Sequence, residues 1–270
     1  MLRAISIAAA LAALTGAALL CGAPGGTVMA AGKTTPLRVL FVGNSYIFVN
    51  DLPAMIQAMA AAAGQSRRLE YTLNAPGGCT LQRHWESTGV RKQIAAGTWD
   101  VVVLQEQSQM PFVRAEVFQK FAALLAKEAA AAGAKPLFYQ TWARKDAPQT
   151  QEALTREYAA AARSSGGAMA PVGEAFAACR RQHPGIGLYH SDGSHPSVAG
   201  TYLAACIFYR VLYNADPRGL PAKLSAAGKT LANLAEPQAQ ALQALAWEIA
   251  GEAPSPTTQE APAPKSSADK

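Results

Sequence analysis

The chain has 270 residues, of which 50% are hydrophobic and 16% are charged, and its formal net charge at pH 7 is +6. Its basic residues occur as scattered pairs, such as Arg67 with Arg68, instead of one run, which argues against a nucleic-acid partner. The region 36–251 contains no internal repeat and no low-complexity linker, so it predicts one domain with a sizeable core.

Both ends of the chain differ in composition from this region. Residues 1–31 have one positive charge, Arg3, then an apolar run over 5–20 and small residues at the end, which predicts a secretory signal peptide. Cys21 suggests lipoprotein processing instead, but the leucine before it stands where a small residue is expected. We therefore expect an exported protein, periplasmic or extracellular, without stable membrane insertion. Residues 252–270 are rich in Pro, Ala and Ser and predict a disordered tail.

Apolar, partly β-branched runs alternate with Ala-rich amphipathic stretches along the domain. The apolar runs predict strands at 37–43, 67–74, 99–105 and 134–141, with a short fifth strand at 168–174. The amphipathic stretches predict helices at 52–64, 115–133 and 150–166, and the apolar stretch 198–213 predicts a last large helix. This alternation predicts an α/β fold, a flavodoxin-like three-layer α/β/α sandwich around a central parallel sheet of about five strands. Ligands of such sheets bind beyond the carboxyl ends of the strands.

Three cysteines follow the predicted signal peptide, namely Cys79, Cys179 and Cys206. Three cysteines permit at most one internal disulfide, which excludes a dense disulfide scaffold. No pair of cysteines or histidines has the spacing of zinc ligands. We therefore expect neither a metal nor a cofactor.

Ionisable residues are concentrated in HSDGSHPSVAG, residues 190–200, directly before an apolar stretch. One interpretation is a polar loop that caps the following helix, with Pro196 in its first turn. The other is an acid/base pair, in which the Asp192 carboxylate fixes the tautomer of the His195 imidazole and stabilises its protonated form. His190 has the same chemistry as His195. The second interpretation requires a nucleophile elsewhere in the chain.

A candidate nucleophile, Ser45, stands in GNS (43–45) at the end of the first predicted strand. The glycine of this stretch lets the chain turn sharply, so the serine can face the cleft beyond the sheet. A short Gly-Asn-Ser turn without catalytic function is the alternative interpretation of these three residues.

Together, GNS and the DGSHP stretch (192–196) resemble the SGNH hydrolases, also called the GDSL family of esterases and lipases. The resemblance extends over residues 37–213, and it is specific at both ends. It implies that Ser45 is the nucleophile, that His195 is the general base and that Asp192 orients this base.

The resemblance also implies an oxyanion hole made by backbone and side-chain donors. In NAPGGCTL, Gly78 matches the glycine whose N–H joins that of Ser45, and Gly77 is the alternative. The family's Gly-x-Asn-Asp motif is missing here, and the chain has LQEQS in its place. Gln105 is the first choice for the missing amide donor, and Gln107 is the alternative. LQEQS also resembles the corresponding segment of carbohydrate-acting SGNH esterases.

Other polar and aromatic residues are weaker candidates for contact with substrate. His84 follows Gly78 closely in sequence, Glu106 is a candidate cleft carboxylate, and Tyr189 offers a flat face to a sugar ring. Trp85 and Trp142 are explained equally well as packing residues.

The resemblance therefore predicts a secreted serine esterase that hydrolyses acetyl or other short acyl esters, on carbohydrate or cell-wall glycans. Its expected partners are an acylated carbohydrate or a small ester, with no nucleic acid. The alternatives are an acyltransferase with a sugar acceptor, a lipase or arylesterase, and a non-catalytic glycan-binding protein on the same fold.

Overall fold

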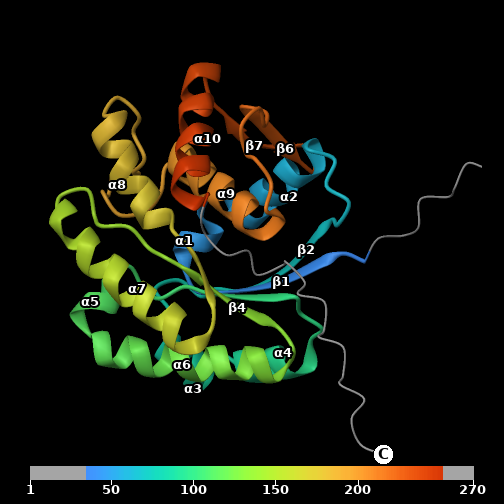
Figure 1. Cartoon of the computed structure of the whole chain (residues 1–270), viewed down its shortest axis with the longest axis vertical. Helices are drawn as coiled ribbons and strands as arrows, with labels where there is room; N and C mark the ends of the chain where they lie inside the picture. The colour runs from blue at the N-terminus through green and yellow to red at the C-terminus, as the bar shows by residue number, and fades with distance from the viewer. Residues whose placement is uncertain (1–34, 252–270) are drawn as a thin grey trace, which may run out of the picture. The chain divides into compact units, whose positions relative to one another are not determined.

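The computed structural model describes residues 35–251 (Figure 1). The strand order of its parallel sheet is β2-β1-β3-β4-β5. The predicted signal peptide at 1–31 and the predicted tail at 252–270 lie outside the described residues. The strands of the sheet are β1 (Leu37–Val42), β2 (Leu69–Asn74), β3 (Val101–Leu104), β4 (Lys135–Tyr139) and β5 (Ala168–Ala170).

Helices cover both faces of this sheet, which gives the three-layer α/β/α sandwich that the sequence predicts (Figure 1). One layer consists of α3 (Leu81–Ser87), α4 (Val90–Ala96), α5 (Met110–Val113), α6 (Ala115–Ala131) and α7 (Gln151–Ser165). The other consists of α1 (Ser45–Phe48), α2 (Leu52–Ala62), α8 (Val172–Gln182), α9 (Val198–Tyr213) and α10 (Glu236–Ala250). Within residues 35–251, none of the helices has the length and apolar character needed to cross a membrane.

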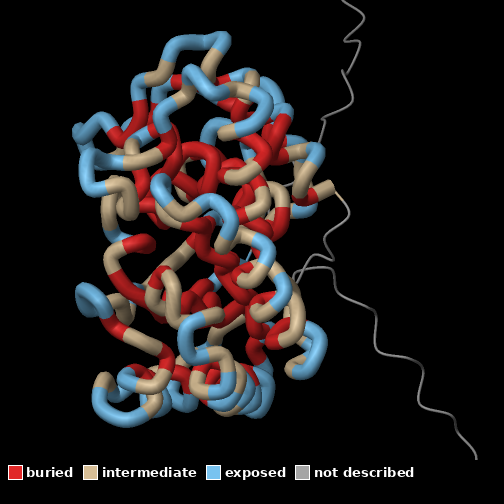
Figure 2. Tube along the Cα trace, turned by 90° about the vertical axis from the view of Figure 1, so that its left-hand side faces the viewer, coloured by how far each residue is buried: buried red, intermediate tan, exposed pale blue. Residues whose placement is uncertain are grey.

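Side chains that alternate along the strands divide the core into two clusters, one on each face of the sheet. Val39 and Phe41 of β1 belong to one cluster, whereas Leu40 and Val42 belong to the other. A strand imposes this period of two on its side chains. All four are fully buried, and Figure 2 shows the buried residues along the inner segments and exposed residues at the outer turns. The continuous apolar sequence of β1 thus follows from burial on both faces.

The structure differs from the prediction at the edges of the fold. The predicted strand 168–174 ends at Ala170, because Pro171 has no N–H to donate to a sheet and α8 begins directly after it. Six helices, namely α1, α3, α4, α5, α8 and α10, were not predicted, and neither was an antiparallel hairpin formed by β6 (Lys223–Ala226) and β7 (Lys229–Asn233). These elements are held by contact with α6, α9 and α2, which a local sequence pattern does not reveal.

The order of the strands places the candidate site between β1 and β3. From β1 the chain passes to β2 on one side and then returns to β3 on the other side, so the direction of winding changes at β1. The crevice at such a change, beyond the carboxyl ends of the strands, is a preferred ligand site. Gly43 follows β1 directly and Gln105 follows β3 directly. The fold therefore brings the GNS turn and the LQEQS segment together at the same end of the sheet.

Candidate active site

The turn after β1 places Ser45 at the first position of α1. Gly43 allows this turn to pack, because a Cβ at its position would lie only 2.3 Å from Gln105 Oε1. Asn44 caps α1, and its Oδ1 accepts a hydrogen bond from Tyr46 N at 3.2 Å. The N–H of Ser45 is one of the donors at a helix start that have no partner within the helix. It is therefore available to an oxygen in the crevice.

The structure brings Ser45, His195 and Asp192 together. Ser45 Oγ lies 2.8 Å from His195 Nε2, and Asp192 Oδ2 lies 2.5 Å from His195 Nδ1. Asp192 Oδ1 also accepts hydrogen bonds from the backbone N–H groups of Ser194 and His195, both at 2.9 Å. The hydrogen bond from the His195 ring, together with these N–H groups, holds the pKa of Asp192 well below its usual range. The carboxylate is thus ionised at neutral pH and can stabilise a protonated imidazole.

Aromatic residues hold the loop 190–196 in place. Tyr46 OH and Ser194 Oγ form a hydrogen bond of 2.6 Å, and Trp142 Nε1 donates to Ser194 O at 3.0 Å. The Trp142 indole is stacked between the rings of Tyr46 and Phe176, at centroid distances of 4.5 and 4.2 Å. Trp142 is fully buried, so it acts in packing and offers no flat face to a sugar.

We expect Tyr46→Phe to lower kcat by less than about tenfold and the free energy of unfolding by about 1 kcal/mol, the usual worth of one hydrogen bond. The ring keeps its stack with Trp142, and Ser194 Oγ loses one partner. Urea unfolding and steady-state kinetics with an aryl acetate measure the two quantities. A loss of activity as large as that expected for Ser45→Ala would contradict this role, because the hydroxyl would then take part in the chemistry.

Asn44 and Gln105 connect the Ser45 turn to the two neighbouring loops. Asn44 N donates to Gln105 Oε1 at 2.9 Å, while Gln105 Nε2 donates to Asn44 Oδ1 at 3.1 Å and to Glu106 O at 2.5 Å. Asn44 Nδ2 donates to Cys79 O at 3.0 Å. Both hydrogens of the Gln105 amide are therefore occupied, and the side chain is fully buried. This corrects the first choice made from the sequence: Gln105 positions the turn and has no hydrogen left for an oxyanion.

Gln107, the alternative, has an amide that remains available. Its Oε1 accepts a hydrogen bond from Gln109 N at 3.3 Å, and its Nε2 has no partner among residues 35–251. Strand β3 ends at Leu104, and the chain turns at Gln107, whose carbonyl accepts from Met110 N at 3.0 Å. In an extended segment, residues two positions apart point to the same side. Because the extended segment ends before Gln107, the two glutamine side chains do not have this relation.

Gly78 lies in a tight turn after β2. Cys79 N donates to Pro76 O at 3.1 Å, and Gly78, at the third position of this turn, has φ +65°. This is the left-handed region that a type II turn requires at that position and that favours glycine. The Gly78 N–H donates to none of the described residues. Because Asn44 Nδ2 holds Cys79 O, this N–H is fixed relative to the Ser45 turn.

Glu106 is not a cleft carboxylate, which corrects the expectation from the sequence. Only 2% of the residue is exposed, and its carboxylate accepts hydrogen bonds from Gln107 N at 2.6 Å and from Leu81 N at 3.2 Å. Burial raises the pKa of Glu106 to about 7, although these two N–H groups act in the opposite direction. Glu106 thus joins the loop after β3 to the start of α3.

The raised pKa of Glu106 predicts a pH-dependent stability. A carboxyl that holds its proton more tightly in the folded protein contributes stability that is complete below its ordinary pKa of 4.5 and is lost as the pH rises toward 7. We expect this contribution to amount to about 3 kcal/mol. Glu106→Gln should remove it, since the amide oxygen accepts the same two N–H groups without titrating. Urea unfolding of the wild-type and Glu106→Gln proteins at a series of pH values measures the effect. The same dependence of the free energy of unfolding on pH in both proteins would contradict it.

Two histidines that the sequence suggested do not approach Ser45. His84 is fully buried; its Nε2 donates to Gly43 O at 2.7 Å, and its Nδ1 lies 3.1 Å from Thr88 Oγ1. Burial lowers the pKa of His84, so the ring is neutral. His84 therefore supports the Ser45 turn from inside and has no exposed surface to offer a substrate, contrary to expectation. His190 is exposed, and the ring that faces Ser45 is that of His195.

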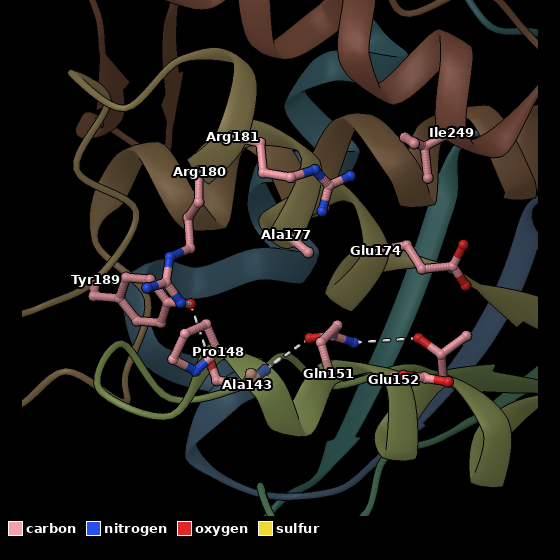
Figure 3. Close-up of a pocket in the computed structure, with 11 residues that line it drawn as sticks. Ala143, Pro148, Gln151, Glu152, Glu174, Ala177, Arg180, Arg181, Tyr189 and Ile249 are labelled. Atoms are coloured by element: carbon pink, nitrogen blue, oxygen red, sulfur yellow. Dashed lines mark hydrogen bonds between the residues drawn. The ribbon is translucent and has the colours of Figure 1, made fainter.

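Tyr189 lines a cavity of about 600 Å³ between α7 and α8, and Ser45, Asp192 and His195 are not among the residues that line it (Figure 3). The Tyr189 hydroxyl donates to Ala143 O at 2.8 Å, and the Arg180 guanidinium lies 5.4 Å from the centre of the ring. The ring is thus covered on one side by a cation. Tyr189 borders the loop 190–196 from the side of this cavity and does not present a sugar platform beside Ser45.

Cys79, Cys179 and Cys206 are free thiols and buried. Burial raises the pKa of Cys179 to about 11, which keeps this thiol protonated at neutral pH. Across residues 35–251, no three side chains of the His, Cys, Asp or Glu type are grouped as metal ligands would be.

Comparison with known proteins finds similarity in solved structures. No family model matches the chain, and neither does any curated protein. A protein from Slackia heliotrinireducens, provisionally described as an SGNH hydrolase, is 30% identical with a TM-score of 0.56, over 65% of this chain and 98% of that one. A DUF4886 family protein from Bacteroides uniformis is 18% identical with a TM-score of 0.64, over 79% and 94% of the two chains.

A third similar structure is that of a variant of Axe2, an acetylxylan esterase from Geobacillus stearothermophilus. It is 15% identical with a TM-score of 0.55, over 66% of this chain and 95% of that one. The similarity to the Bacteroides and Geobacillus proteins is one of fold alone. The Slackia protein shares more of the sequence, and this chain covers nearly its whole length.

Proposed function

Because the chain belongs to the SGNH hydrolases, also called the GDSL family, we propose that it is a serine esterase that removes acetyl or other short acyl groups from carbohydrate. One observation carries this proposal: the hydrogen bonds that run from Ser45 Oγ through His195 to Asp192. A serine, a histidine and an ionised aspartate in this order provide a nucleophile, a base and the group that orients the base.

In the proposed reaction, Ser45 Oγ attacks the ester carbonyl carbon while His195 Nε2 takes the hydroxyl proton. Asp192 holds the ring and stabilises its positive charge. When the tetrahedral intermediate collapses, His195 gives the proton to the leaving alcohol and an acyl-Ser45 enzyme remains. Water, deprotonated by His195, then releases the acid and restores Ser45. The atoms and charges balance without a cofactor.

We assign the stabilisation of the oxyanion to the N–H groups of Ser45 and Gly78 and to the Gln107 amide. Each of the three has a hydrogen that no described residue accepts. Asn44 supports this assignment, because it caps the Ser45 helix and also bonds Cys79 O beside Gly78. Donors fixed before the reaction stabilise a developing negative charge without reorganisation.

The choice of carbohydrate as substrate rests on the LQEQS segment, which resembles that of carbohydrate-acting esterases of this family. Export of the enzyme, predicted from residues 1–31, would bring it to glycans outside the cytoplasm. The proposal therefore places the enzyme in the periplasm or outside the cell, and cell fractionation and determination of the mature N-terminus test this.

Acetate release by the purified protein tests the function. We expect hydrolysis of aryl acetates and of acetylated polysaccharides, and slower hydrolysis as the acyl chain lengthens. Faster hydrolysis of long acyl chains would indicate a lipase, and acetyl groups recovered on an added sugar acceptor instead of as free acetate would indicate a transferase. No acetate from any of these esters would contradict the proposal.

A further inference from the structure

The three residues that follow β3 differ in what their side chains bond. Gln105 bonds the turn after β1, and the Gln107 amide has a hydrogen that none of the residues 35–251 accepts. Glu106 lies between them, and its carboxylate accepts hydrogen bonds from Gln107 N at 2.6 Å and from Leu81 N at 3.2 Å. Leu81 begins α3, three residues after Gly78. One carboxylate therefore bonds the segments that carry two of the three assigned oxyanion donors.

The backbone of Glu106 is also held on both sides. Its N–H donates to Tyr158 OH at 3.2 Å, and its carbonyl accepts a hydrogen bond from Gln105 Nε2 at 2.5 Å. Because both backbone groups are bonded, the direction in which the side chain leaves the backbone is set. The carboxylate thus joins the loop after β3 to the start of α3, across 25 positions of the sequence, from a fixed base.

The carboxyl of Glu106 is buried without a positively charged partner. Only 2% of the residue is exposed, and none of the ion pairs among residues 35–251 includes it. Burial of an unpaired carboxyl costs free energy, and such groups are concentrated at functional sites. The position of Glu106 therefore needs an explanation, and the two N–H groups that it holds supply one.

We propose that Glu106 is a positioning residue of the oxyanion hole, which holds the Gln107 amide in a fixed place relative to the Gly78 N–H. This inference rests on the proposed esterase function and on the assignment of Gln107, and it adds a residue that acts without touching substrate. Oxyanion donors act through their placement, and a displacement of about 1 Å can lower a rate by about a hundredfold. The carboxylate limits such a displacement, because it bonds both segments at once.

Two substitutions at position 106 test this role. In Glu106→Gln, one amide oxygen can accept both N–H groups, because Oε1 alone lies 2.6 Å from Gln107 N and 3.3 Å from Leu81 N. Glu106→Leu keeps a side chain of similar size and removes every acceptor. With an aryl acetate, we expect Glu106→Leu to lower kcat by about tenfold to a hundredfold at unchanged KM, since the oxyanion forms only during the reaction. Glu106→Gln should keep kcat within about threefold of the wild type, because the donors stay in place.

A double substitution tests whether Glu106 acts through Gln107. In a protein that already carries Gln107→Ala, we expect Glu106→Leu to lower kcat by less than about threefold, because residues that act as one unit do not contribute additively. Glu106→Asp provides a second variant in case Glu106→Leu does not fold. Its carboxylate stays in the same loop as Gln107 N but is one methylene short of Leu81 N. We expect its kcat to fall by about tenfold, and this fall should also disappear in the Gln107→Ala background.

Gln243→Leu is the matched control for loss of stability. Gln243 is also 2% exposed, and its side chain accepts a hydrogen bond from Gly219 N at 2.9 Å and donates one to Leu220 O at 2.7 Å. It thus joins α10 to another segment of the chain by buried hydrogen bonds, as Glu106 joins two segments at the site. We expect Gln243→Leu to lower the urea midpoint as Glu106→Leu does, but to keep kcat within about twofold of the wild type.

Several results would overturn the positioning role and leave the esterase function intact. They are an unchanged kcat in a folded Glu106→Leu or Glu106→Asp protein, an equal loss in Glu106→Gln and Glu106→Leu, and the same fall with and without the Gln107 amide. An equal loss of kcat in Gln243→Leu would also overturn it, because the effect would then follow stability alone. No hydrolysis by the wild-type protein would overturn the proposed function and this inference with it.

Discussion

Ser45→Ala is expected to lower ester hydrolysis by roughly three orders of magnitude or more, because loss of one member of a nucleophile–base pair removes the contribution of the whole unit. The hydroxyl makes one side-chain hydrogen bond, to His195 Nε2, and the residue is only half-buried. The free energy of unfolding should therefore change by no more than about 0.5 kcal/mol. Initial rates with an aryl acetate and urea unfolding measure both quantities.

A pair of histidines supplies the control for this result. His195→Ala should reduce activity as much as Ser45→Ala does, whereas His190→Ala should keep activity close to that of the wild type. Both histidines belong to the same loop, but only the ring of His195 faces Ser45 Oγ, at 2.8 Å. Activity of Ser45→Ala within about tenfold of the wild type would remove the assignment of the nucleophile.

Gln107→Ala is expected to lower kcat by roughly two to three orders of magnitude, the usual effect of deleting one oxyanion donor. Its stability should change little, because the side chain is half-buried and its Nε2 has no partner among the described residues. Steady-state kinetics and urea unfolding, performed on the same preparation, give the two values. Near-normal turnover would show that the Gln107 amide is not part of the oxyanion hole.

Gln105→Ala should lower the stability of the protein more than Gln107→Ala does, and its kcat less. The substitution leaves Asn44 N and Asn44 Oδ1 without their buried partner, which is expected to destabilise the fold by about 1–3 kcal/mol. We expect the turnover of Gln105→Ala to fall only indirectly, because the turn that carries Ser45 is held less tightly. A large loss of kcat in a Gln105→Ala protein of wild-type stability would contradict the positioning role and restore the first choice made from the sequence.

The sheet could be predicted from the sequence because its strands are buried on both faces. The segments 37–43 and 99–105 are almost continuously apolar, and such runs have few alternatives in a soluble domain. The contact among Ser45, Asp192 and His195 could be predicted for a different reason. Each of the three lies within a recognisable local motif, and the family order of the motifs predicts that they meet. The two interpretations of 190–200 are also compatible, since Ser197 caps α9 directly after the loop that presents His195. Pro196, however, lies before this cap and not in the first turn of the helix, as the sequence had suggested.

The residues that the sequence placed wrongly depend on contacts between distant segments. Gln105 and Gln107 could not be distinguished, because the choice depends on where β3 ends and on the bond between Gln105 and Asn44 across 61 positions. His84 is a neighbour of Gly78 in sequence, but α3 turns its ring inward to Gly43 O. For Asn44, the capping position was a usable signal, whereas its bond to Cys79 O had none.

The central claim is that Ser45 is the single nucleophile of the crevice, and covalent labelling tests it most directly. A fluorophosphonate reacts with a serine that an adjacent base activates. Peptide mapping by mass spectrometry should find one label per chain, on Ser45, and no label on Ser45→Ala under the same conditions. A label on another residue, or equal labelling of Ser45→Ala, would contradict the account.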